Sequence, residues 1–247
     1  MKGAPTRAAP RSTPRTAVVW AVLRRELDRM GAALTVVDVG GGTGGFAVPL
    51  AEAGHRVTVV DSSPDALAAL TRRAAEAGVA GRVTAVQGDG DRLADLVPAA
   101  GAHLVLCHSL LEVVDDPATV ATGLATALRP GGAASVLVAN LAAAVLARAV
   151  AGNLAAAGAL LADPHGAPRP GMPRRRFDTA SASALLAGAG LAVEQIHGVR
   201  VVADLVPGAA ADADPQALLS IEMAMAARPP YRDIATQLHL LARRPGG

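Results

Sequence analysis

A run of glycines between residues 40 and 45 is the segment of this sequence best suited to chemistry. It follows an apolar, β-branched stretch at 36–39 and precedes a segment of helical composition. Glycines allow the backbone to turn sharply and to approach a ligand closely, and the amides that open the following helix favour negative charge. The run therefore predicts a loop that binds a small anionic or zwitterionic molecule.

The glycine spacing fits two classes of cofactor. Gly40, Gly42 and Gly45 satisfy the G-x-G-x-x-G pattern of dinucleotide-binding proteins. With Gly44 in the last position, the pattern becomes the G-x-G-x-G of S-adenosylmethionine (SAM) enzymes. Asp61 ends the next β-branched run, where a carboxylate can accept both hydroxyls of an adenosine ribose. Both cofactors contain that ribose, so Asp61 predicts a nucleoside without distinguishing between them.

Three further segments bear on this choice. Gly88-Asp89-Gly90-Asp91 follows the third expected strand, and its acids and amides can recognise adenine, although Asp89 and Asp91 can equally cap a helix. Asp38 precedes the glycines within the first strand, and Leu128-Arg129-Pro130-Gly131-Gly132 lies between the fourth helix and the fifth strand. The last two features are typical of class I SAM-dependent methyltransferases.

Short β-branched runs alternate with longer Ala- and Leu-rich segments from Thr35 onward, and these elements must position the glycine loop. We expect strands at residues 35–39, 56–61, 83–87, 103–108, 134–139, 192–202 and 237–243. Helices are expected at 16–30, 46–53, 64–77, 91–96, 117–127, 142–161 with an interruption at Gly152, 181–189 and 215–227. The alternation predicts an α/β fold with a parallel sheet and helices on both faces. The resemblance to class I SAM-dependent methyltransferases implies the Rossmann-like form of this fold, with a mostly parallel seven-stranded sheet.

Composition excludes several classes of protein. The 247 residues are 51% hydrophobic, which is too apolar for a disordered chain, and a formal charge of +2 with 2% aromatic residues does not suit a base-stacking nucleic-acid binder. Cys107 is the only cysteine, which favours a reducing, cytoplasmic compartment. The apolar stretch 133–162 is interrupted by Asn140, Arg148 and Asn153, so we expect no membrane span.

We predict a disordered lead-in at residues 1–14 and one domain at 15–247, with an acceptor-side cap around 141–180.

The sequence more closely resembles the tRNA 5-carboxymethoxyuridine methyltransferases, which esterify a carboxylate on the wobble uridine. The resemblance covers roughly residues 15–245 and is carried by motifs spread along the chain. These motifs are Arg15-x-Ala17-x-x-Trp20, Gly40-Gly41-Gly42-x-Gly44, Ala53-Gly54-His55-x-Val57, His108-x-Leu110-Leu111-Glu112-Val113-Val114-x-Asp116-Pro117, Val150-Ala151-Gly152-Asn153, Gly171-Met172-Pro173, Gly198-Val199-Arg200-Val201, Pro230-Tyr231 and His239-x-x-Ala242-Arg243-x-Pro245.

The resemblance implies SAM as cofactor and assigns roles around it. Arg15 would meet the methionine carboxylate, Gly40 and Gly41 would line the cofactor's backbone, and His108 would lie beside the methionine moiety. Asp61 would hold the ribose, with the 90–91 segment beside the adenine. The predicted cofactor site comprises Arg15, Asp38, Gly40, Gly41, Gly42, Gly44, Asp61, Ser62, Asp89, Gly90, Asp91 and His108.

The acceptor is either a tRNA wobble nucleoside or a small carboxylated or hydroxylated metabolite. Predicted substrate-binding residues are Arg174, Arg175, Arg176, Arg200 and Tyr231, because guanidinium groups bind phosphates and carboxylates. A carboxylate acceptor needs no general base, whereas for a hydroxyl or amine His108 or Glu112 can take the proton. No metal-ligand cluster is evident, and the oligomeric state stays open. The alternatives are a non-catalytic SAM-binding protein and a nicotinamide-dependent reductase, which is disfavoured because the only lysine is Lys2.

Overall fold

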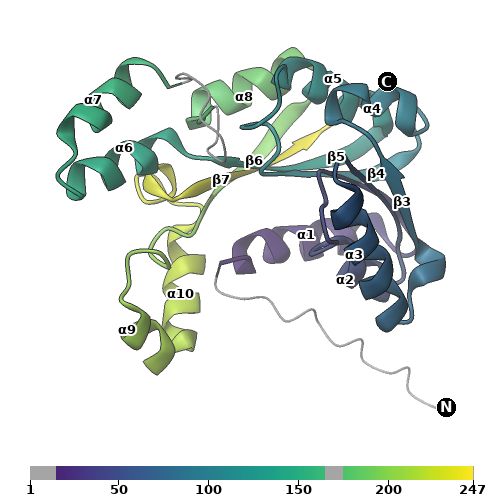
Figure 1. The fold of residues 1–247 in the computed structure, drawn as a ribbon, viewed down its shortest axis with the longest axis horizontal. Coiled ribbons are helices and arrows are strands. Elements are labelled where there is room, and N and C mark those ends of the chain that lie inside the picture. The colour runs from purple at the N-terminus through teal and green to yellow at the C-terminus, as the bar shows by residue number, and fades with distance from the viewer. Residues whose placement is uncertain (1–14, 165–174, 247) are drawn as a thin grey trace.

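The structure is a computed structural model that describes residues 15–164 and 175–246 (Figure 1). Seven strands form one sheet in the order β3-β2-β1-β4-β5-β7-β6. β7 is antiparallel to both of its neighbours, and the remaining pairs are parallel. The strands are β1 Thr35–Val39, β2 Arg56–Asp61, β3 Val83–Gln87, β4 Ala102–His108, β5 Leu128–Ala139, β6 Ala192–Val199 and β7 Gln237–Arg243. The fold predicted from the sequence is confirmed. The predicted lead-in at 1–14 and Arg174 lie outside the described residues.

Helices cover both faces of the sheet (Figure 1). α1 to α3 pack with one apolar cluster, and α4, α5 and α8 pack with the other. The helices are α1 Ala17–Met30, α2 Ala47–Glu52, α3 Pro64–Glu76, α4 Leu93–Leu96, α5 Pro117–Ala127, α6 Leu141–Val150, α7 Leu154–Ala162, α8 Thr179–Gly188, α9 Gly208–Ala213 and α10 Pro215–Met225, with 3-10 turns at Ala80–Arg82, Gly90–Arg92 and Arg232–Ile234. Among the residues described, no helix has both the length and the apolarity to cross a membrane.

Local sequence explains where several helices begin. Ser63 caps α3 by accepting a hydrogen bond from the amide of Ala66, and Pro64 occupies the first turn. Asp178 forms a capping box with Ser181 at the start of α8. The expected interruption between α6 and α7 is confirmed at Gly152, whose φ of +79° disfavours other residues.

The expected strand at 192–202 is too long, because β6 ends at Val199. Glu222 of α10 is fully buried, and its carboxylate accepts hydrogen bonds from the amides of Val201, Val202 and Ala203 at 2.6–3.0 Å. These amides are therefore satisfied by a side chain instead of a neighbouring strand. β5, by contrast, is longer than expected, because it begins at Leu128, six residues before the expected start at 134.

α1 is tied to the antiparallel end of the sheet by an ion-pair network. Arg243 of β7 contacts Glu26 of α1 at 2.9 Å and forms two hydrogen bonds of 2.6 and 2.7 Å to Glu194 of β6. Glu26 also pairs with Arg29 one turn later. The bidentate geometry at Glu194 gives this network more directional strength than a single surface contact.

A buried carboxyl group lies under the glycine loop. Asp38 of β1 is 2% exposed, and its Oδ2 has no hydrogen-bond partner among the described residues. A Cβ atom on Gly41 would lie 2.6 Å from this side chain, so the loop packs directly on it. Burial, with a smaller contribution from the charge of Asp61, raises the pKa of Asp38 to about 7.

We expect Asp38→Asn to flatten the pH dependence of stability. The folded-state pKa of about 7 lies above the ordinary value of 3.8, so between these values the folded protein holds a proton that the unfolded chain releases. Stability therefore falls as the pH rises through this window. At pH 8 the free energy of unfolding of the variant should exceed that of the wild type by a few kcal/mol, on the order of 4 at most.

Urea unfolding of both proteins at several values between pH 4 and pH 8 measures this difference. Other buried groups titrate in the same range, and subtracting the variant from the wild type removes their contribution. Parallel stability curves for the two proteins would contradict the assignment of a raised pKa to Asp38.

Candidate SAM and acceptor site

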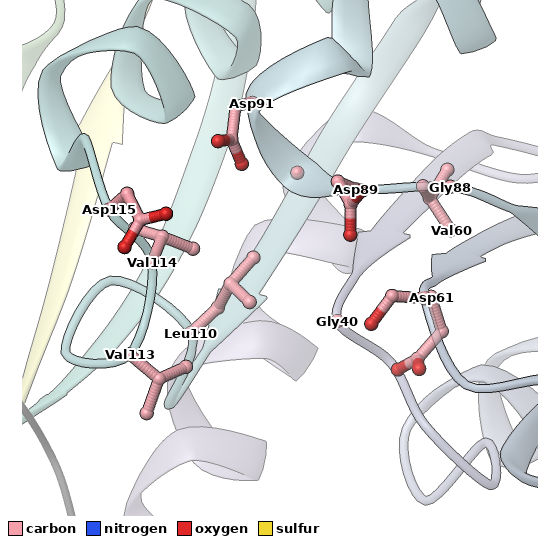
Figure 2. Close-up of a pocket in the computed structure, with 12 residues that line it drawn as sticks. Gly40, Val60, Asp61, Gly88, Asp89, Asp91, Leu110, Val113, Val114 and Asp115 are labelled. Atoms are coloured by element: carbon pink, nitrogen blue, oxygen red, sulfur yellow. The ribbon is translucent and has the colours of Figure 1, made fainter. Parts of the chain in front are cut away.

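A cavity of about 350 Å³ opens at the carboxyl ends of β1 to β4 (Figure 2). Parallel α/β sheets commonly bind ligands at this edge, where the strand order reverses. Its lining comes from the glycine loop, the end of β2, the segment after β3 and the turn after β4. The lining residues are Gly40, Val60, Asp61, Ser62, Gly88, Asp89, Gly90, Asp91, Leu110, Val113, Val114 and Asp115.

The glycine loop approaches the cavity through backbone that other residues rarely adopt. Gly40, Gly42 and Gly44 have φ values of +70°, +54° and +79°. A Cβ atom on Gly44 would also lie 2.3 Å from Cδ1 of Leu70, so a side chain at position 44 would displace the Leu70 side chain of α3. Gly40 borders the cavity directly, whereas Gly41, Gly42 and Gly44 shape the loop that contains it.

Asp61 joins the end of β2 to this loop. Its Oδ2 accepts a hydrogen bond from the amide of Gly42 at 2.8 Å, and its Oδ1 accepts one from Ser63 at 2.9 Å. A carboxylate has about four acceptor positions, so two remain for a ligand. This arrangement fits the two hydroxyls of a ribose, as the sequence predicts, and adds a structural role that the sequence does not reveal.

The opposite wall of the cavity is formed mainly by apolar side chains, with the carboxylate of Asp115 beside Val114 (Figure 2). Leu110, Val113 and Val114 face Asp61 and Asp89 across the space (Figure 2). An apolar wall opposite carboxylates and glycine amides suits a flat adenine ring beside its ribose. The residues brought together thus fit the adenosyl part of SAM.

Arg175 holds the apolar wall in place. Its amide donates to the carbonyl of Glu112 at 3.0 Å, and its guanidinium donates to the carbonyls of Val114 and of Asp115, the latter at 2.6 Å. The sequence predicts that Arg175 binds substrate, but the structure engages its guanidinium with the backbone of the cofactor cavity.

Glu112 and Arg176 are an acidic and a basic side chain whose pKa values are both shifted by burial. Glu112 is 3% exposed and its Oε2 lacks a hydrogen-bond partner among the described residues. Burial raises the pKa of Glu112 to about 7. Hydrogen bonds from the backbone amides of Glu112 and Ala139, and the charge of Arg176, lower the pKa by a smaller amount. Burial also lowers the pKa of Arg176, as does the charge of Arg148. Glu112 can therefore exchange a proton near neutral pH.

His108 lies at the end of β4, two residues before Leu110 of the apolar wall. Its Nε2 is 2.9 Å from Oγ of Ser135, and Phe46, which follows the glycine loop, packs edge-on against its ring at 4.6 Å. Burial lowers the pKa of His108 to about 4, so the imidazole is neutral at pH 7. His108 does not line the 350 Å³ cavity.

Three other predicted residues lie apart from this cavity. Arg15 is 66% exposed and pairs with Asp204 at 3.6 Å, and Arg200 pairs with the same carboxylate. Asp204 also accepts a hydrogen bond from the hydroxyl of Thr236. Tyr231 is 46% exposed beside the 3-10 turn at 232–234. Their roles toward SAM and acceptor stay predictions.

The sequence interpretation missed part of the site. It named the carboxylates and glycines but assigned no binding role to Leu110, Val113, Val114 and Asp115. Their signal was positional, because they directly follow a predicted strand at the ligand-binding edge. Ser135 and Asp204, which engage His108 and Arg15, carried no comparable signal.

Comparison with known proteins agrees with this geometry. A family model described as a methyltransferase domain matches residues 36–132. A SAM-dependent methyltransferase from Mesorhizobium loti has a similar fold, with a TM-score of 0.63 and 24% identity over 92% of this chain and 98% of that chain. The tRNA 5-carboxymethoxyuridine methyltransferase of Escherichia coli K12 is 31% identical over an alignment of 242 residues that covers 94% of this chain and 88% of that protein. A ubiquinone biosynthesis O-methyltransferase from Ralstonia nicotianae is 39% identical over 97 residues, 39% of this chain and 40% of that protein.

The fold, the glycine loop and the nucleoside cavity are those of a class I SAM-dependent methyltransferase, and SAM is its cofactor. Within that class, the chain belongs to the family of the E. coli tRNA 5-carboxymethoxyuridine methyltransferase.

We expect Asp61→Ala to weaken SAM binding by about a hundredfold or more, because it leaves two ribose hydroxyls and the amide of Gly42 without their acceptor. Calorimetric titration with SAM measures the affinity, and circular dichroism verifies the fold. Asp65→Ala is the matched control, since Asp65 is an exposed carboxylate at the start of α3 outside the cavity. Equal affinities in the two variants would refute the ribose role.

We expect Arg175→Ala to weaken SAM binding about tenfold, because the 112–115 turn loses hydrogen bonds that hold the apolar wall. Arg72→Ala, which removes an exposed arginine of α3, should leave binding unchanged. The KM values for SAM and for the acceptor separate the two possible roles. A rise confined to the acceptor KM would restore the substrate role predicted from the sequence.

Proposed function

We propose that this protein transfers the methyl group of SAM to a carboxylate on a modified wobble uridine of tRNA. The observation that carries the proposal is the extent of similarity to the E. coli relative, which covers 94% of this chain and so includes the acceptor-side elements. The similarity to the ubiquinone biosynthesis O-methyltransferase extends over only 97 residues. A tRNA acceptor is consistent with the cytoplasmic location that we predict from the single cysteine.

The proposed reaction requires little proton chemistry from the protein. Bound SAM supplies an electrophilic methyl group on a sulfonium. A carboxylate is already ionised at pH 7 and attacks without a general base, so the chain's task is to align the two partners. Such positioning can contribute roughly 7–11 kcal/mol to lowering a barrier. Asp61 and the apolar wall at 110–114 orient the donor side of this pair.

Arg148 and Arg176 support an anionic acceptor. Arg148 belongs to α6, and Arg176 lies in the segment that pairs with the end of β5 through Phe177. Each is partly buried, and neither forms an ion pair within the described part of the chain. The charge of Arg148 lowers the pKa of Arg176, so the two guanidinium groups repel each other. A carboxylate or phosphate bound between them would offset this repulsion. The α6–α7 hairpin would then form the acceptor-side cap that we predict around 141–180.

A second candidate is a small-molecule O-methyltransferase. Glu112 favours it, because a buried carboxyl group with a pKa of about 7 can take the proton of a hydroxyl acceptor. The partial similarity to ubiquinone biosynthesis O-methyltransferases points in the same direction.

Mass spectrometry of tRNA nucleosides from cells with and without the gene distinguishes these functions. We expect the free 5-carboxymethoxyuridine to accumulate, and its methyl ester to disappear, when the gene is deleted. Unchanged tRNA nucleosides together with an altered small metabolite would favour the second candidate. SAM binding without methyl transfer to either pool would identify a non-catalytic SAM-binding protein.

Salt dependence of acceptor binding provides an independent measurement. A tRNA complex should weaken steeply as salt rises, because each neutralised phosphate releases counterions. Binding of a small neutral metabolite should change little over the same range. A flat salt profile for tRNA would contradict the proposal.

A further inference from the structure

Two polar residues at the carboxyl edge of the sheet have a left-handed backbone. Ser109 directly follows β4 with a φ of +56°, and Arg200 directly follows β6 with a φ of +62°. β6 ends at the same edge as β4 and β5, because β7 is antiparallel to both β5 and β6. This conformation is uncommon for residues with a side chain, and it concentrates at binding and active sites.

The start of β7 holds both strained residues in place. The amide of Thr236 donates to the carbonyl of Arg200 at 3.2 Å, and Nε2 of Gln237 donates to Oγ of Ser109 at 3.1 Å. The carbonyl of Thr236 also accepts a hydrogen bond from the amide of Asn140 at 3.1 Å. Two consecutive residues therefore connect the ends of β4, β5 and β6.

The bond between Ser109 and Gln237 lies between the cofactor cavity and the region where we propose that the acceptor binds. Ser109 directly precedes Leu110, which lines the cavity. Gln237 pairs with Ala139 at the end of β5, and the segment 176–177 bonds to the same residue through its second amide. Ser109 is exposed and Gln237 is half-buried, so a ligand can reach both side chains.

This pair offers a ligand one hydrogen-bond donor and one acceptor. The hydroxyl of Ser109 accepts from Gln237, so its own proton remains available, and Oε1 of Gln237 has no hydrogen-bond partner in the described part of the chain. A hydroxyl proton beside an amide oxygen complements a carbonyl beside an N–H. The imide edge of uracil presents O4 beside N3–H, whereas cytosine presents an amino donor beside an acceptor nitrogen.

We propose that Ser109 and Gln237 bind the imide edge of the acceptor's uracil base, with the hydroxyl donating to O4 and the amide oxygen accepting N3–H. This assignment rests on the proposed function, because it takes the acceptor to be a wobble uridine. Unstacked RNA bases are commonly read by hydrogen bonds on this edge. Arg148 and Arg176 then attract the negative charge of the acceptor, while Ser109 and Gln237 select its base.

A chemical change in the acceptor tests the proposal directly. Two synthetic anticodon stem-loops would carry 5-carboxymethoxyuridine or its N3-methyl derivative at the wobble position. We expect N3 methylation to lower kcat/KM of the wild type about tenfold or more, because the amide oxygen of Gln237 loses its donor. Gln237→Leu should already be about tenfold less active on the first stem-loop, and N3 methylation should cost this variant little more.

The outcomes separate the two proposals. Equal use of both stem-loops by the wild type, or an undiminished N3-methyl effect in Gln237→Leu, would refute recognition of the imide edge. No methyl transfer by the wild type to the first stem-loop would contradict the proposed function instead. Gln195→Leu, which removes an exposed amide from β6, should leave kcat/KM for the first stem-loop unchanged.

Two substitutions at Ser109 separate recognition from folding. Ser109→Gly and Ser109→Ala both remove the hydroxyl, but glycine tolerates the left-handed backbone, whereas alanine retains its strain. The glycine variant should therefore unfold at a higher temperature than the alanine variant. Both variants should raise the acceptor KM about tenfold with the SAM affinity unchanged. An acceptor KM that rises only in the less stable variant would contradict the binding role.

Ser183→Ala is the matched control for these variants. Its hydroxyl donates to the carbonyl of Thr179 within α8, so its removal should leave the acceptor KM unchanged. An equal rise in the acceptor KM for Ser183→Ala would also contradict a specific role for Ser109.

Discussion

The glycine loop depends on its contact with two carboxyl groups, one buried beneath it and one beside it. Asp38 lies beneath the loop, where burial keeps it protonated up to about pH 7, and Asp61 lies beside it and binds the amide of Gly42. Any Cβ atom at position 41 would collide with Asp38. The loop, the end of β2 and the nucleoside cavity therefore form one unit, in which a change in the loop alters the position of the ribose-binding carboxylate.

The region around the end of β5 and α10, where we propose that the acceptor binds, is built on a different principle. There, buried side chains bind backbone groups of distant segments: Asn140 donates to the carbonyls of Asp233 and Ala235, and Glu222 accepts from the amides at 201–203. These bonds connect the end of β5, the turn before β7 and α10. The cofactor cavity is thus fixed by strand pairing and glycine turns, and the proposed acceptor region by individual polar side chains.

This difference explains how far the sequence could predict the structure. The strands at 35–39, 56–61, 83–87 and 237–243 were predicted with the observed bounds. The first three are β-branched runs bounded by Gly or Asp, which are local signals. The glycines, Asp61 and the 88–91 segment were placed together because the carboxyl ends of parallel strands share one edge. The early end of β6 depends on Glu222, more than twenty residues away in the chain. The hydrogen bonds of the Ser135 hydroxyl depend on two histidines from other strands, His108 and His239. Such long-range pairings leave no periodic pattern in the sequence.

The contact of Arg175 with the 112–115 turn has a thermodynamic consequence. Phe177 pairs with Asn140 at the end of β5. Two residues earlier, Arg175 binds the backbone of the turn that forms one wall of the cofactor cavity. If the acceptor binds beside this segment, as we propose, any free-energy change that it causes there reaches the adenine cavity through Arg175. Linkage then requires that acceptor and cofactor change each other's affinity by the same factor.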